Sequence, residues 1–110
     1  MGLFGFGKKK YVKRVTRNNH FLKEYARKLC LLMDTLDVNE KVLPELVKLK
    51  EDFEYTVPTN IDDATRYEKQ IADDYEALVD LFDQGTWSES EVLRLIRRIR
   101  RNIGEMSSLR

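Results

Sequence analysis

Side chains able to act as nucleophiles or general bases are scarce in this sequence. Cys30 is the only cysteine and His20 the only histidine in 110 residues. Cys30 lies within the apolar run 29–33, which predicts a small buried side chain and not an activated thiolate. With one histidine and no nucleophile-elbow motif, the sequence offers few residues that could form a catalytic triad. We therefore expect no catalytic residue and a protein that is not an enzyme.

Acidic residues are numerous, but their spacing matches no known metal-binding pattern. A calcium loop needs acidic residues at alternate positions around a central glycine, and helical di-metal sites need Glu-x-x-His pairs. The 19 Asp and Glu residues of the chain form neither arrangement. His20 and Glu24 lie four residues apart, the spacing of an ion pair on a helix surface. We therefore expect no metal site, no cofactor and no small-molecule substrate.

The N-terminal segment combines apolar and basic residues in a way typical of peripheral membrane attachment. It places three large apolar residues before three lysines, namely Leu3, Phe4, Phe6, Lys8, Lys9 and Lys10. Apolar side chains insert at a membrane interface, and each nearby lysine adds about 1 kcal/mol of attraction to anionic lipid. Phe6 replaces the Ser or Thr of a myristoylation motif, so acylation is not expected. The glycines predict a flexible tail over residues 1–10, and a terminus without any role is the simplest alternative.

The net charge of +1 results from segments of opposite sign. Residues 1–28 contain nine basic and one acidic side chain, residues 29–90 contain five basic and sixteen acidic ones, and residues 91–110 contain six basic and two acidic ones. Two basic ends therefore flank an acidic middle. Such an asymmetry indicates an interaction surface more than it indicates a fold.

The basic residues of the two ends are expected to meet if the first and last helices of a bundle are neighbours. The joined face would contain Lys13, Arg14, Arg17, Lys23, Arg27 and Lys28 with Arg94, Arg97, Arg98, Arg100 and Arg101. A face of this kind attracts phosphate, and nucleic acid is one source. The acidic middle and the pI of about 7.8 count against a polyanion partner. The simplest alternative is that basic outer helices complement acidic inner ones and stay solvated.

The spacing of apolar residues predicts an all-α protein. Helices are expected at about 11–36, 44–56, 61–84 and 88–106, arranged as an antiparallel up-and-down bundle of three to four helices. The last of them is the clearest, since its apolar residues recur at alternating steps of four and three: Val92, Ile96, Ile99, Ile103 and Met106. Residues 11–110 would then form one domain, which is what the length of the chain allows.

The ends of these helices carry specific signals. Ser88 and Glu91 have the spacing of a capping box, and Trp87 and Val92 have that of a hydrophobic staple. Gly85 marks a helix end.

Other boundaries leave alternatives open. Thr59 or Asn60 is expected to cap the third helix, and Asn18 or Asn19 offers a later start for the first. Pro44 suits the first turn of the second helix, although that helix could instead begin at Asn39 with a kink at Pro44.

These features favour an interaction protein over a catalyst. We expect a non-enzymatic helical interaction or scaffold module that binds a protein partner or itself, with peripheral attachment to an anionic membrane through the N-terminal tail. The alternative is a nucleic-acid-associated protein. No run approaches the roughly 18 apolar residues of a membrane span, and a single cysteine fits a reducing compartment, so a cytoplasmic location, with a membrane-peripheral fraction, is expected.

Overall fold

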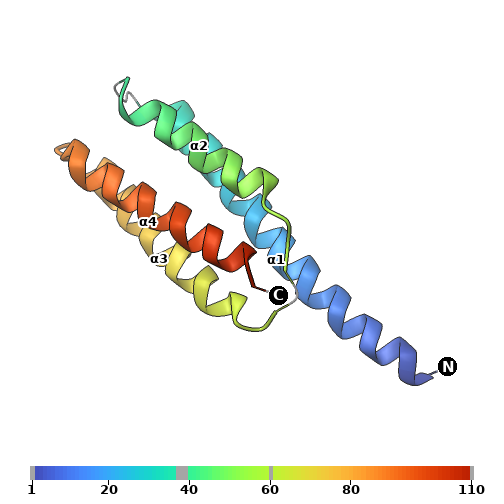
Figure 1. Ribbon diagram of the computed structural model, residues 1–110. Helices are drawn as coiled ribbons and strands as arrows, with labels where there is room; N and C mark the ends of the chain where they lie inside the picture. The colour runs from blue at the N-terminus through green and yellow to red at the C-terminus, as the bar shows by residue number, and fades with distance from the viewer. Residues whose placement is uncertain (1, 37–39, 60, 110) are drawn as a thin grey trace.

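The computed structural model describes the backbone of residues 2–36, 40–59 and 61–109, and the side chains of these ranges from Arg17 onward (Figure 1). All regular secondary structure in these ranges is helical. The four helices are α1 (Gly2–Thr35), α2 (Val42–Tyr55), α3 (Ala64–Asp83) and α4 (Glu89–Ser107). The prediction of an all-α chain is therefore confirmed.

The main difference from the sequence prediction is the start of the first helix. α1 begins at Gly2 and not near Tyr11, and it continues through Asn18 and Asn19, so a later start at those residues is wrong. Each glycine costs about 1 kcal/mol in a helix, but an established helix gains one hydrogen bond for every residue it adds. The predicted flexibility of residues 1–10 stays a prediction.

The other three helices begin and end within three residues of their predicted bounds. Pro44 lies in the first turn of α2, where its missing N–H has no intrahelical role; Asn39, the alternative start, lies outside the described residues. α3 begins at Ala64 and not at 61, because residues 61–63 form a turn in which the Ala64 N–H donates to the carbonyl of Ile61. Asp63 is the N-cap of α3, so the prediction of Thr59 as its cap is wrong. Thr59 Oγ1 instead accepts the N–H of Ile61 just before the helix, and Asn60 lies outside the described residues.

The capping box predicted for the last helix is wrong. Ser88 is the N-cap and has extended backbone, but its side chain makes no capping hydrogen bond. Its Oγ lies 2.8 Å from the Oγ of Ser90. Trp87 packs edge-on against Phe82, with 5.3 Å between ring centroids, so the turn between α3 and α4 is held by aromatic contact.

The core forms where three helix pairs pack closely: α1 with α2, α2 with α4, and α4 with α3 (Figure 1). α4 therefore lies between α2 and α3, and its predicted stripe is buried along its whole length. The buried apolar residues are Leu22, Ala26, Leu29, Val42, Leu46, Leu49, Phe53, Ala64, Ile71, Tyr75, Leu78, Phe82, Val92, Leu95, Ile96, Ile99, Ile103 and Met106. Burial of each large side chain contributes about 1.5–3 kcal/mol.

Gly85 and Gly104 allow a matched test of backbone conformation. Gly85 has φ +76 at the end of α3, whereas Gly104 is helical within α4, and a Cβ at either position would meet no atom within 4 Å. We expect Gly85→Ala to lower the free energy of unfolding by about 1 kcal/mol, since an L-residue is strained at positive φ. Gly104→Ala should raise it by up to about 1 kcal/mol. Urea unfolding of both variants checks this, and equal effects would contradict it.

Candidate functional site

The first helix runs beyond the bundle at the N-terminal end of the chain (Figure 1). α1 has 34 residues, whereas α3 and α4 have 20 and 19. We call residues 2–16 the arm; it contains Leu3, Phe4, Phe6, Lys8, Lys9 and Lys10, the predicted membrane contacts. In the sequence, Tyr11 and Val15 continue the register of the buried Leu22 and Leu29. In the sequence, the apolar register of α1 thus continues into the arm.

A buried asparagine ties α1 to the rest of the bundle just after the arm. Asn18 is only 2% exposed. Its Oδ1 accepts the backbone N–H of Thr59 at 2.9 Å, and its Nδ2 donates to Glu68 Oε2 at 3.2 Å and reaches Met106 Sδ at 3.5 Å. One side chain therefore connects α1 with the α2–α3 link, α3 and α4. The pattern that could have revealed this role is a polar residue within an apolar register; from the sequence, Asn18 was expected only as a cap.

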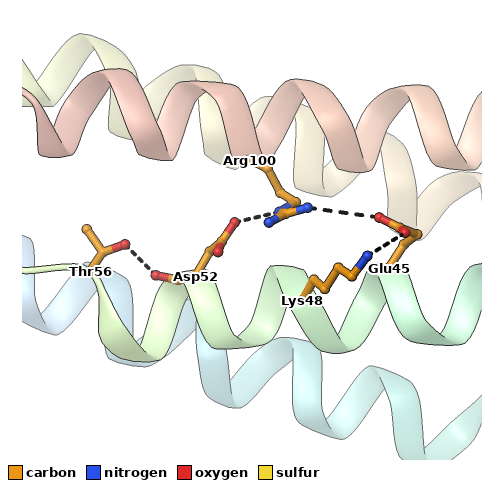
Figure 2. Close-up of polar contacts among 5 residues, drawn as sticks. All are labelled: Glu45, Lys48, Asp52, Thr56 and Arg100. Carbon is orange, nitrogen blue, oxygen red and sulfur yellow. Dashed lines mark hydrogen bonds and ion pairs between the residues drawn. The ribbon is translucent and has the colours of Figure 1, made fainter.

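Two arginines of α4 bind acidic residues on the neighbouring helices. The Nε of Arg100 lies 2.7 Å from Asp52 Oδ2, and its Nη1 lies 4.0 Å from Glu45 Oε2, both on α2 (Figure 2). The hydrogen bond to Asp52 raises the pKa of the Arg100 guanidinium. On the other side of α4, Arg98 Nη2 lies 3.3 Å from Asp74 Oδ1 of α3. Ion pairs thus connect α4 to α2 and α3, the two helices that also bury its apolar stripe.

The basic face predicted for the first and last helices is not formed. Close backbone packing pairs α4 with α2 and α3, while α1 packs closely against α2. The exposed basic residues are consequently divided between two surfaces. Arg17, Lys23, Arg27 and Lys28 are exposed on α1, and Arg94, Arg97, Arg98 and Arg101 are exposed on α4. The side chains of Lys13 and Arg14 lie outside the described residues. Arg94, Arg97 and Arg101 form no ion pair with any other described residue, whereas Arg98 and Arg100 bind acidic residues of α3 and α2.

An open groove separates α1 from α3, which do not pack closely along their backbones. Its volume is about 610 Å³. The lining residues are Tyr25, Lys28, Leu31, Leu32 and Thr35 of α1 and Tyr75, Glu76, Val79 and Asp80 of α3. Leu31 is 61% exposed, and the two helices touch beneath the groove through Tyr25 and Tyr75, whose ring centroids are 5.2 Å apart. We call this feature the α1–α3 groove; the sequence did not predict it.

The floor of the groove is apolar enough to change the acidity of both tyrosines. Burial raises the pKa of Tyr75 to about 12 and also raises that of Tyr25, where the charge of Lys28 opposes the effect. The rim is acidic, since Glu76 and Asp80 face one lysine, Lys28, which lies 3.4 Å from Glu24. The groove therefore offers apolar contact at its base and negative charge at its edge.

Two expectations about single residues had different outcomes. His20 Nε2 lies 3.7 Å from Glu24 Oε2, which confirms the predicted surface pair. Cys30 is exposed, so the prediction of a buried thiol is wrong. Successive helical residues are about 100° apart, and Leu29 takes the inward position of the apolar run. In consequence Cys30 and Leu31 face outward.

The described residues contain no metal site, and comparison with known proteins finds no relative. In the part of the chain that the structure describes, no three His, Cys, Asp or Glu side chains are grouped to hold a metal ion. None of the helices described there combines the length and hydropathy needed to cross a membrane. No family model matches the chain, and neither a curated protein nor a solved structure matches it.

Replacing Asn18 should destabilise the fold more than replacing its neighbour. Asn18→Ala removes three hydrogen bonds and leaves the buried Glu68 carboxylate without that donor, so we expect the free energy of unfolding to fall by about 2–3 kcal/mol. Asn19→Ala, a half-buried position in the same turn, should change it by less than about 0.5 kcal/mol. Urea unfolding of both variants measures the difference, and similar losses would argue against the Asn18 network.

Tyr75 should make the protein less stable in alkaline solution. An unfolded tyrosine ionises near pH 10.0 and folded Tyr75 near 12, so between these values the unfolded chain releases a proton that the folded chain keeps. The stabilisation is complete below pH 10.0 and is lost as pH rises toward 12. Tyr75→Phe should flatten this decline, while Tyr55→Phe, at an exposed position, should not. Unfolding free energies measured across this range test the expectation, and parallel curves for wild type and Tyr75→Phe would refute it.

Proposed function

We propose that this chain is a non-enzymatic helical interaction module whose arm attaches it to an anionic membrane surface. The observation that carries the proposal is the continuation of α1 as a helix beyond the bundle, in a segment whose sequence joins large apolar residues to consecutive lysines. We further propose that α1 with α2, and α3 with α4, form two helical hairpins of an antiparallel up-and-down bundle. Short links between the members of each pair support this arrangement.

The physical argument for attachment combines backbone, charge and apolar burial. A helix satisfies its own backbone hydrogen bonds, which allows it to lie at the boundary between lipid headgroups and acyl chains. Five basic residues fall within the arm, and each contributes about 1 kcal/mol near an anionic surface; they are Lys8, Lys9, Lys10, Lys13 and Arg14. The leaflet with this charge is the cytoplasmic one, so the proposed location is cytoplasmic and membrane-peripheral.

The basic side chains of α4 are expected to contribute unequally. Arg94, Arg97 and Arg101 are exposed and free of described ion pairs, which supports a second electrostatic contact with an anionic surface. Arg98 is held by Asp74 and should add less. No observation favours nucleic acid over a membrane, because the basic residues of α1 and α4 lie on separate surfaces.

Flotation with vesicles containing phosphatidylserine tests the proposal. The intact protein should float, and Lys8→Glu, Lys9→Glu and Lys10→Glu combined should lower its partition coefficient at least about tenfold, since roughly 1 kcal/mol is lost for each lysine. Replacing Leu3, Phe4 and Phe6 by Ser should also weaken binding.

The matched control reverses three lysines outside the arm, with the combined changes Lys23→Glu, Lys48→Glu and Lys69→Glu. These positions are exposed, and the change in net charge is the same. An equal loss in the control would show that only net charge matters. Failure of the intact protein to float on anionic vesicles would end the membrane proposal.

A further inference from the structure

We propose that the α1–α3 groove binds the arm of a second copy of this chain, so that two copies exchange arms in a closed dimer. The groove lies between α1 and α3, which do not pack closely along their backbones, whereas α1–α2, α2–α4 and α4–α3 do. The arm is helical, and the N-terminal end of α1 runs beyond the rest of the bundle (Figure 1). The inference concerns a different contact from the membrane proposal and does not rest on it.

Charge favours the arm as the occupant. The arm contains five basic and no acidic residues, whereas the α3 edge of the groove presents Glu76 and Asp80, with Asp73 and Asp83 also exposed along the same helix. The only basic residue lining the groove, Lys28, lies 3.4 Å from Glu24. A basic helix is therefore attracted to this edge, and an acidic helix is repelled by it.

The base of the groove provides apolar contact for the arm. Leu31 is exposed, and Leu32 and Val79 are partly buried, in a hollow of about 610 Å³. Large apolar residues occur along the arm at Leu3, Phe4, Phe6, Tyr11, Val12 and Val15. Recognition of an apolar helix stripe by a groove between two helices is a common mode of binding.

The lengths agree with a reciprocal exchange. The 15 residues of the arm span about 22 Å as a helix, and the groove runs from Tyr25 to Thr35, about 15 Å along α1. If the α1 helices of two copies run in opposite directions and cross near Asn19, residues 2–16 of one copy lie opposite residues 22–36 of the other. The three lysines of the arm then lie at the level of Glu76 and Asp80.

Two-fold symmetry closes this arrangement. Each bundle extends away from the crossing point in the opposite direction, so the two bundles do not compete for space. Both arms and both grooves are used, which leaves no free site for a third copy. The predicted product is a dimer and not an open chain of copies.

Light scattering after size-exclusion chromatography tests the dimer. At low salt and about 100 µM protein, the intact chain should have twice the 13.0 kDa mass of one copy, and added salt should shift it toward one copy. A mass of one copy at low salt over the whole concentration range would overturn the inference. A series of masses above two copies would overturn the reciprocal exchange.

Charge-swapped variants test which surfaces meet. The groove variant carries Glu76→Lys and Asp80→Lys, and the arm variant carries Lys8→Glu, Lys9→Glu and Lys10→Glu. Each variant alone should be monomeric, because like charges then face each other. A mixture of the two should form a mixed dimer, because each arm then meets a groove of opposite charge. Absence of the mixed dimer would overturn the proposed pairing.

A matched control changes the same charge elsewhere on the surface. Glu51→Lys with Glu105→Lys, both exposed, should leave the dimer intact, and so should Leu43→Glu, whereas Leu31→Glu should abolish it. Circular dichroism checks that all variants remain helical. The groove variant retains an unchanged arm, so its flotation on anionic vesicles should persist; this separates failure of the dimer from failure of membrane attachment.

Discussion

Helix α4 must bury an apolar stripe that is wide enough to face two helices at once, and the positions of the other helices follow from this constraint. Val92, Ile96 and Ile99 are completely buried, and Leu95 is nearly so. A stripe of this width is covered only if α2 and α3 both pack against α4. Arg100 and Arg98 then reach outward from the two edges of the stripe to acidic residues of α2 and α3. Apolar burial stabilises this arrangement. The ion pair of Arg100 places one side of α4 against α2, and the ion pair of Arg98 places the other side against α3.

The central position of α4 leaves α1 with only one close neighbour. α1 packs along α2, and it meets α3 mainly through the ring contact of Tyr25 with Tyr75 and the hydrogen bonds of Arg17 and Asn18. The α1–α3 groove is a consequence of this incomplete packing. Asn18 lies two residues after the arm, and its three partners on separate elements hold the helix in one register there. A polar side chain in an apolar seam commonly has this effect on register.

The charge asymmetry of the chain has two different consequences in the folded protein. Within the bundle, opposite charges meet across helix interfaces, as Arg100 does with Asp52 and Glu45 (Figure 2). Outside it, all charged residues of the arm are basic, and all exposed charged residues in the second half of α3, from Asp73 to Asp83, are acidic. Exposed charges of opposite sign on one molecule favour contacts with other surfaces, whether an anionic membrane or a second copy. The arm proposed to bind both would be shared between two competing partners.

The sequence by itself determined the helices and the inward residues of α4, because both depend on local periodicity: the stripe of α4 and the His20–Glu24 pair both lie where spacing predicted. It did not determine which helices are neighbours, since a stripe specifies burial but not the partner that covers it. For that reason the joined basic face was wrong, Cys30 was misplaced, and the α1–α3 groove and the role of Asn18 went unpredicted. Those features depend on contacts between residues as far apart as Asn18 and Met106, which only the tertiary structure brings together.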